Sequence, residues 1–312
     1  MARNPLTFLD ILPRIIIFLI WTGGTSVYMW DVSTSLIKAS KKKYIIQDWI
    51  FIGVFIFLSI IFLWTYYVAC WSDPGSTERF YKKLGVLDKI LEKKIPPELT
   101  LMPVCKVCHL PKPERTHHCS RCNQCYFRFD HHCPLIGNCV ALNNFKGFIL
   151  MPIYGGILCI LLSIELFMQH RKAFYYSIIP LPFAAYFIYF SLSYCRNIVK
   201  NVTTLETFTF KVDNIFGSNR FKNFQQFFDG FFGVFLPTKP KISGFYWSGE
   251  QVVNMVKDLE EKMKKDKIAK RKERKEKKEK ESQKDETNDV DDIIDNIDKA
   301  KEVEGDIEKK LI

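Results

Sequence analysis

The chain has 312 residues and a formal net charge of +11, and 47% of its residues are hydrophobic. These averages hide an uneven distribution, because the apolar residues form long blocks while residues 251–312 are dominated by charge. A single soluble domain that buries these apolar blocks in its core is therefore the weaker interpretation. Nucleic-acid binding would fit the charge but not a basic segment tethered to membrane spans.

Four blocks are long enough to cross a bilayer, which takes about 20 apolar residues in a helix. In chain order they run from Ile11 to Trp30, Trp49 to Trp71, Phe148 to Met168 and Phe174 to Cys195. The second block contains no charge and has aromatic residues at both ends, which suits membrane interfaces. The other three contain proline, paired glycine or a charged residue, which spanning helices tolerate when their neighbours satisfy the backbone. The predicted fold is an all-α polytopic membrane protein with four transmembrane helices.

An even number of spans places both termini and the loop from Ser72 to Gly147 on the same side of the membrane. That loop and the C-terminal tail carry most of the lysine and arginine, so the positive-inside rule makes this side cytosolic. Four lysines between positions 38 and 43 oppose this orientation, because the short first hairpin loop would face the lumen. The pattern does not decide between an endomembrane (ER, Golgi or vacuole) and the plasma membrane.

The loop predicted to be cytosolic contains a cysteine-rich stretch, CKVCHLPKPERTHHCSRCNQCYFRFDHHCPLIGNC, at residues 105–139. It holds seven of the ten cysteines of the chain, and C-x2-C spacing occurs in it three times. Thiols stay reduced in the cytosol, so this spacing favours metal ligands over disulfides. Six cysteines and two histidines would make two closed structural zinc sites, each with three Cys and one His.

One cysteine of the stretch would then be left without a metal, and Cys133 is the best candidate. Asp130 and His131 precede it at a spacing that can form a proton relay, in which the carboxylate orients the imidazole. The thiolate is the reactive form of cysteine, and a neighbouring histidine supplies it. The residues alone leave two alternatives open, namely that Cys133 is another ligand or an inert thiol.

These residues resemble the DHHC-type protein S-acyltransferases, polytopic enzymes that attach palmitate to cysteines of membrane-bound proteins. Asp130-His131-His132-Cys133 is the signature tetrapeptide, and the surrounding cysteines and histidines fall at the spacing of the family. Three outlying motifs also match, namely Asp73-Pro74-Gly75, the TTxE motif at Thr203–Glu206, and Lys222-Asn223-Phe224. The resemblance covers about residues 10 to 240.

The resemblance implies how the ligands are divided. One zinc ion would be held by Cys105, Cys108, His118 and Cys125, and the second by Cys119, Cys122, His132 and Cys139. Cys133 would be the acyl-accepting nucleophile, His131 its base and Asp130 the residue that orients the base. Both zinc ions are expected to be structural, because a site with four protein ligands leaves no open position for water.

The implied reaction transfers a long-chain acyl group from acyl-CoA, such as palmitoyl-CoA, to cysteine thiols of membrane-associated proteins through an S-acyl-enzyme intermediate. The expected partners are acyl-CoA, such protein substrates and the lipid bilayer, without nucleic acid. Lys112, Arg115, Arg121 and Arg128 are candidates for contacting the CoA phosphates, and residues near Leu158 for the floor of an acyl cavity. The alternative function is a membrane-anchored zinc-binding interaction module without acyltransferase activity, against which the spare Cys133 argues.

Three positions depart from residues that are common in the family. Leu135 stands in place of tryptophan, Gly137 in place of asparagine and Ala141 in place of glycine. None of the three is a predicted ligand or nucleophile, so the departures concern acyl handling rather than the chemistry itself.

The chain is expected to consist of six parts. These are a cytosolic N-terminus (1–10), a first transmembrane hairpin (11–71), a cytosolic loop (72–147) around the zinc-binding core (105–139), a second hairpin (148–195), a cytosolic segment with the TTxE motif (196–250), and a charged tail that is helical or disordered (251–312). Within the fifth part, the aromatic stretch from Phe221 to Phe235 is too short and polar to span, and is predicted to be an amphipathic segment.

Overall fold

A computed structural model describes residues 4, 7–38, 45–169, 175–209, 216, 219–228 and 230–276. The chain divides into two compact units, Met1–Val256 and Lys257–Ile312. The first unit contains the long helices and the cysteine-rich stretch. In the second unit the described residues, 257–276, are helical and exposed apart from Leu259, Glu260 and Met263, and residues 277–312 of the predicted tail lie outside the described residues.

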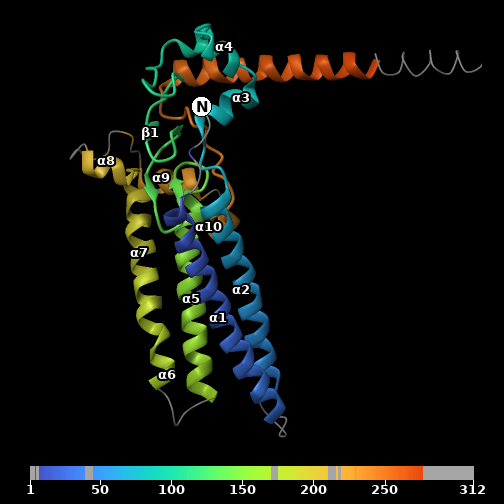
Figure 1. Ribbon diagram of the computed structural model, residues 1–312, viewed down its shortest axis with the longest axis vertical. Coiled ribbons are helices and arrows are strands. Elements are labelled where there is room, and N and C mark those ends of the chain that lie inside the picture. Colours follow the sequence, from blue (N-terminus) through green and yellow to red (C-terminus); the bar gives the residue numbers. More distant parts are fainter. Residues whose placement is uncertain are drawn as a thin grey trace, which may run out of the picture. The chain divides into compact units, whose positions relative to one another are not determined.

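Four long helices dominate the first unit (Figure 1). They are α1 (Phe8–Lys38), α2 (Ile45–Trp71), α5 (Phe145–Gln169) and α7 (Pro180–Lys200), and the four-residue helix α6 (Tyr175–Ile178) precedes α7. Four segments are long and apolar enough to cross a membrane, namely Phe8–Thr34, Trp49–Trp71, Phe145–Met168 and Tyr175–Lys200. The predicted helical fold with four spans is confirmed, and the two short hairpins of the cysteine-rich domain are the strands that the sequence did not predict.

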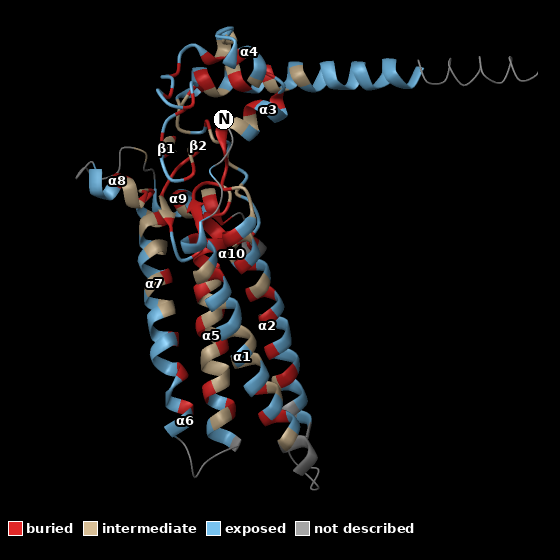
Figure 2. Cartoon of the chain, in the orientation of Figure 1, coloured by how far each residue is buried: buried red, intermediate tan, exposed pale blue. Residues whose placement is uncertain are grey.

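Helix α5 lies at the centre of the bundle and contacts α1, α2 and α7. Its side chains are the most buried of the four spans, whereas α1, α2 and α7 expose apolar side chains along much of their length (Figure 2). That arrangement suits a bilayer, in which lipid rather than water surrounds the apolar outer surface. Between the helices, Tyr28 and Phe55 stack with ring centroids 3.8 Å apart, and Leu158 belongs to the same buried cluster.

The cysteine-rich stretch forms a small domain at one end of the bundle (Figure 1). Three short helices precede it, α3 (Thr77–Leu84), α4 (Leu87–Leu91) and the 3-10 helix η1 (Pro97–Leu99), and it contains two hairpins, β1 (His117–Cys119) with β2 (Gln124–Tyr126) and β3 (His131–Cys133) with β4 (Asn138–Val140). Each strand has only three residues. Isolated two-stranded sheets are marginal in water, so these hairpins need packing and metal to hold their shape.

Two asparagines tie the domain to the end of α2. The side-chain amides of Asn138 and Asn144 both donate to the carbonyl oxygen of Ala69 at 3.2 Å, and Asn138 also donates to that of Ser72 at 3.1 Å. The last turn of a helix leaves its carbonyls without intrahelical partners. The asparagines supply the missing donors and thereby hold β4 and the start of α5 against α2.

The segment after α7 returns to the same domain. It forms α8 (Thr204–Thr209), α9 (Arg220–Phe227) and α10 (Gly230–Phe235). The side-chain amide of Asn223 donates to the carbonyl oxygen of Val199 at 2.9 Å, and Tyr154 donates to that of Phe235 at 2.7 Å. The aromatic stretch from Phe221 to Phe235 therefore packs on the ends of α5 and α7 as two short helices.

Candidate active site and metal centres

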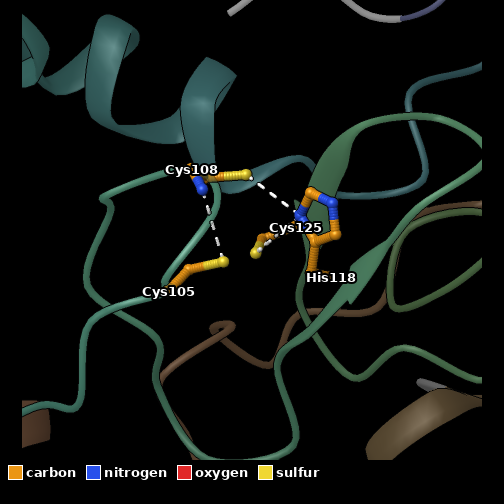
Figure 3. A group of neighbouring side chains, drawn as sticks. All are labelled: Cys105, Cys108, His118 and Cys125. Carbon is orange, nitrogen blue, oxygen red and sulfur yellow. Dashed lines mark hydrogen bonds between the residues drawn. The ribbon is translucent and has the colours of Figure 1, made fainter.

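The first Cys/His cluster gathers Cys105, Cys108, His118 and Cys125, whose ligand atoms all lie within 4.8 Å of one another. Figure 3 shows the four side chains directed toward a common centre, two from the loop before β1 and two from the first hairpin. Nδ1 of His118 lies 3.2 Å from Sγ of Cys108 and 3.8 Å from Sγ of Cys125. Neighbouring ligands of tetrahedral zinc lie about 3.6 Å apart, so the donor set and its spacing fit the ion.

The second cluster gathers Cys119, Cys122, His132 and Cys139 within the same limit. Nδ1 of His132 lies 3.7, 3.4 and 3.5 Å from the three sulfurs, in chain order. The backbone N–H of Cys122 points at Sγ of Cys119 at 3.5 Å, as the N–H of Cys108 points at Sγ of Cys105 at 3.4 Å. Each cluster thus takes two cysteines from one C-x2-C turn. Its histidine and third cysteine stand opposite each other in one hairpin, as His118 and Cys125 in the first and His132 and Cys139 in the second.

Strand alternation explains why adjacent residues serve different purposes. Successive side chains of a strand point to opposite faces. In β1, His118 therefore enters the first cluster while Cys119 enters the second. In β3, His132 faces the second cluster, and His131 and Cys133 share the opposite face. The fold brings both sets of four predicted ligands together and leaves Cys133 outside either set.

Asp130 and His131 form a short contact on the face of β3 that carries Cys133. Oδ2 of Asp130 lies 2.7 Å from Nδ1 of His131, so the other ring nitrogen is left for the Cys133 thiol, with which His131 also forms a hydrogen bond. Burial opposes protonation of the imidazole, but the hydrogen bonds to Asp130 and Cys133 outweigh it and raise the pKa of His131 to about 9. The carboxylate therefore favours the imidazolium form.

Cys133 is buried, with 6% of its surface exposed. Burial alone would raise the pKa of the thiol, yet the hydrogen bond from His131 and those from the backbone N–H groups of Ile136 and Leu135 lower it below its ordinary value. The turn after β3 thus presents two N–H groups and an imidazolium to one sulfur. This environment stabilises a thiolate, the nucleophilic form of cysteine.

The TTxE motif lies against the Asp130 carboxylate. The backbone N–H of Thr204 donates to Oδ1 of Asp130 at 2.8 Å, and although burial would raise the pKa of Asp130, the bonds from His131 and Thr204 lower it. Thr203 and Glu206 form a reciprocal capping box at the start of α8. The backbone N–H of Thr203 donates to Oε2 of Glu206 at 2.9 Å, and the backbone N–H of Glu206 donates to Oγ1 of Thr203 at 3.1 Å. The motif therefore starts a helix whose first N–H group, that of Thr204, faces the site.

Arg115 and Arg128 are not available to CoA phosphates, which corrects the expectation from the sequence. Arg115 is buried and donates to both carboxylate oxygens of Glu206 at 2.7 and 2.6 Å and to Oδ1 of Asn201 at 2.8 Å. Arg128 is fully buried between the rings of Phe145 and Phe227, 4.6 and 4.2 Å from their centroids. Local sequence does not reveal burial, so both arginines had resembled solvated charges.

The other two candidates, Arg121 and Lys112, lie in different parts of the domain. Arg121 is bonded to Thr7 and to Asp10 near the start of α1. Lys112 lines a cavity of about 670 Å³ between the domain and the segment after α7, together with His117 and Trp247. Arg115 borders the same cavity, but its guanidinium is engaged by Glu206 and Asn201, so Lys112 is the candidate that remains available there.

The three departures from the family pattern lie in different environments. Leu135, two residues after Cys133, is 57% exposed, whereas Ala141 is buried in the core of the domain. Gly137 has φ +57°, and a side chain there would meet the carbonyl oxygen of Asp10 and the guanidinium of Arg14. Glycine at position 137 thus permits close approach of α1, which the sequence comparison alone did not suggest.

Taken together, the fold and site define a class: a four-span membrane protein whose cysteine-rich domain holds two Cys/His clusters that can bind metal and an Asp-His-Cys arrangement at its junction with the helices. Residues 101–211 match the model of the DHHC palmitoyltransferase family. The chain therefore carries the domain of that family. This match and the curated relatives described next support its function as a protein S-palmitoyltransferase.

Curated relatives agree with this assignment. The chain is 28% identical over 268 residues to palmitoyltransferase ZDHHC15 of Homo sapiens, an alignment that covers 73% of this chain and 77% of that protein. It is 35% identical over 131 residues to palmitoyltransferase pfa3 of Emericella nidulans, covering 39% of this chain and 25% of that protein. It is 34% identical over 145 residues to the probable protein S-acyltransferase 12 of Arabidopsis thaliana, covering 45% and 50%.

Proposed function

We propose that the chain transfers a long-chain acyl group from acyl-CoA to cysteine thiols of membrane-associated proteins through an S-acyl intermediate on Cys133. The observation that carries this proposal is the arrangement of Asp130, His131 and Cys133, in which a carboxylate lies 2.7 Å from the imidazole that contacts the thiol. A metal-binding module needs eight ligands and no such nucleophile.

In the first half-reaction, the Cys133 proton resides on His131 and the thiolate attacks the carbonyl carbon of the acyl-CoA thioester. The carbon–sulfur bond to CoA breaks, and the departing CoA thiolate takes the proton from His131. In the second half-reaction, a substrate thiol gives its proton to His131 and its sulfur attacks the Cys133 thioester. Cys133 leaves as a thiolate, so atoms and charge balance and the enzyme returns to its starting state.

Asp130 would keep His131 in the orientation that this exchange requires. A thioester is exchanged for a thioester in each half, so the driving force is small and positioning of the reacting groups matters most. The raised pKa of His131 and the lowered pKa of Cys133 both favour the thiolate–imidazolium pair before the substrate arrives.

Two zinc ions would be structural. The first cluster would hold one through Cys105, Cys108, His118 and Cys125, and the second the other through Cys119, Cys122, His132 and Cys139. Each ion supplies cross-links that hold short hairpins in place, and four protein ligands complete its coordination. The second cluster borders the nucleophile directly, because His132 stands between His131 and Cys133 in β3.

The acyl chain would lie along the bundle interior. The His131 ring packs edge-on against Phe148 of α5, with centroids 5.5 Å apart, so the site lies at the end of that helix. Leu158 is buried ten residues further along α5, about 15 Å away at 1.5 Å per residue. Burial of a palmitoyl chain is worth roughly 10 kcal/mol at ~0.8 kcal/mol per CH₂. Lys112 and its cavity are the candidate contacts for the polar CoA group, on the side that the Lys/Arg distribution makes cytosolic.

Incubation of the purified protein with clickable palmitoyl-CoA tests the proposal. We expect hydroxylamine-sensitive label on the wild type, none on Cys133→Ser and undiminished label on Cys195→Ser, in which a cysteine of α7 outside the Asp-His-Cys arrangement and both Cys/His clusters is replaced. Label that persists in Cys133→Ser places the acyl group on another residue. A folded wild type that binds zinc but takes no label would instead be the membrane-anchored interaction module.

A further inference from the structure

Asp10, in the first turn of α1, is a buried acid with only 3% of its surface exposed. Its Oδ2 accepts hydrogen bonds from the backbone N–H of Thr7 at 2.9 Å and from Oγ1 of Thr7 at 2.7 Å. This is the acidic half of a capping box, which fixes the rotamer of the carboxylate. Its Oδ1 is directed toward the cysteine-rich domain and accepts from Nε of Arg121 at 3.1 Å.

His132 of the second cluster meets the same carboxylate. Nδ1 of His132 faces the three sulfurs, while its Nε2 is buried and lies 3.5 Å from Oδ1 of Asp10. This Nε2 has no hydrogen-bond partner among the residues that the structure describes, and the 3.5 Å ion-pair contact with Asp10 is the contact that involves it. A histidine that binds metal through one ring nitrogen usually donates its other N–H to a carboxylate or carbonyl, which fixes the tautomer and orients the ring.

We propose that Asp10 is the positioning residue for His132, so that the first turn of α1 completes the second metal site. Arg121 lies on the same Oδ1 and compensates the charge that a carboxylate adds beside three thiolates. The inference deepens the proposed function, since it rests on metal binding by this cluster. It assigns a role to a residue outside every motif of the cysteine-rich stretch.

The surrounding contacts show that α1 is fitted to this cluster and not merely close to it. The backbone N–H of Asn4 donates to the carbonyl oxygen of Cys122 at 3.2 Å, within the turn that supplies two ligands. On the other side, the Arg14 guanidinium donates to the carbonyl oxygen of Gly137, between Cys133 and Cys139. The absence of a side chain at Gly137 is what admits the backbone of Asp10.

The contact between Asp10 and His132 also bears on catalysis. His132 lies between His131 and Cys133, so the strand that holds its metal-binding ring in place is the three-residue strand that carries both. The carboxylate of Asp10 therefore links the membrane helix α1 to the geometry of the nucleophile. The parallel with Glu206 is close, since each is the acid of a capping box that also bonds to an arginine of the domain.

The test measures zinc retention cluster by cluster in the full-length protein. Wild type, Asp10→Asn and Asp10→Glu are given a short pulse of chelator, retained zinc is measured by mass spectrometry, and newly exposed thiols are alkylated and mapped. We expect Asp10→Asn to release zinc about tenfold faster or more from the cluster of Cys119, Cys122 and Cys139, with the cluster of Cys105, Cys108 and Cys125 unchanged. Asp10→Glu, which keeps a carboxylate, should recover part of the loss.

Two controls separate the possible causes. Arg14→Gln weakens the docking of α1 at Gly137 but leaves the Asp10–His132 contact in place. Release as fast in Arg14→Gln as in Asp10→Asn, equal acceleration in both clusters, or a wild-type rate in Asp10→Asn would each overturn the inference. If Asp10→Asn does not fold, Asp10→Ser keeps a capping oxygen and removes the carboxylate. The zinc content of the untreated wild type tests the metal assignment separately, with two ions expected per chain.

Discussion

The backbone N–H of Thr204 donates a 2.8 Å hydrogen bond to Oδ1 of Asp130, although the two residues are 74 positions apart. Since Oδ2 of Asp130 lies 2.7 Å from Nδ1 of His131, both oxygens of this buried carboxylate are engaged. The orientation of the proposed base is therefore set by the start of α8, which follows the last membrane helix. The TTxE motif and the DHHC motif meet at this one carboxylate.

Replacing Thr204 by proline should slow acylation without breaking α8. Thr204 is the first residue of the helix, a position where proline is tolerated because its N–H is not needed by the helix. A hydrogen bond to a charged group is worth about 1.5–3 kcal/mol, which corresponds to roughly tenfold or more in rate. The measurement is the rate of Cys133 acylation by palmitoyl-CoA, with Thr204→Ala, which keeps the N–H, as the control. Equal rates in the two variants would show that the bond does not orient His131.

Loss of a ligand and loss of the nucleophile should have separable effects. Cys119→Ala removes a sulfur from the second cluster, so zinc content should fall from two ions toward one and the hairpins should lose cooperative unfolding. Cys133→Ala should keep two ions and the wild-type melting temperature while losing the acyl-enzyme. Zinc analysis and thermal unfolding of both variants check this. Zinc loss in Cys133→Ala would contradict the division between ligands and nucleophile.

The buried pair of Arg115 and Glu206 should be strongly coupled. Removing one member of a buried pair leaves an uncompensated charge and costs about 3–5 kcal/mol of unfolding free energy. We expect this loss in Arg115→Met and a partial recovery when Glu206→Gln is added, because the stranded charge is then gone. Denaturant titration followed by fluorescence of Trp247 reports on the region, since Arg115 lies 4.6 Å from the centroid of that ring. Strictly additive losses in the double variant would argue against the coupling.

Alanine at Gly137 should destabilise the protein more than alanine at Gly249. Both glycines have positive φ, +57° and +82°, so the backbone strain of the two substitutions is similar. A methyl group at 137 would be 2.7 Å from Nε of Arg14 and in conflict with the Asp10 carbonyl, while one at 249 would meet nothing. Comparison of the melting temperatures isolates the packing of α1 on the turn after the nucleophile. Equal decreases in the melting temperatures of the two variants would mean that α1 can move away from residue 137 without loss of stability.

A larger side chain at Leu158 should shorten the acyl chains that the enzyme accepts. Leu158 is buried in the interior of the bundle, so Leu158→Trp would fill space that the end of a long chain needs. We expect the ratio of acylation by myristoyl-CoA to that by stearoyl-CoA to rise several-fold, measured in competition. Leu192→Trp on α7, at a position that is exposed on the outside of the bundle, is the matched control. An unchanged ratio in Leu158→Trp would place the chain elsewhere.

Much of the site could be predicted from spacing. The C-x2-C turns and the interleaved histidines predicted two sites of four ligands, and the resemblance to the family divided the ligands between them. The fold brings each of these sets of four within 4.8 Å. The count also left Cys133 over, and strand alternation explains why it can share a short strand with the ligand His132. Asp10 was missed, because an acid at the start of a helix is ordinary capping chemistry and nothing nearby in the sequence identifies its second partner.

The basic residues show where such reasoning stops. Arg115 and Arg128 looked like solvated charges, yet one is buried on Glu206 and the other between Phe145 and Phe227. Glu206 and Phe227 each lie more than 90 residues further along the chain than the arginine they contact, so charge and local pattern carried no information about them. Gly137 is a similar case. The need for glycine at this position comes from the backbone of Asp10, more than a hundred residues earlier, which a side chain at 137 would meet.

The sequence by itself determined the four spans, the types of metal ligand and the spare cysteine, because hydropathy, C-x2-C spacing and the number of ligands can be read from local sequence. Only the tertiary structure decided that Thr204 contacts Asp130, that Glu206 contacts Arg115 and that Asp10 faces His132. These contacts join the ends of α1 and α7 to a domain built of three-residue strands. They depend on how the membrane helices pack, which sets where the helix ends reach that domain.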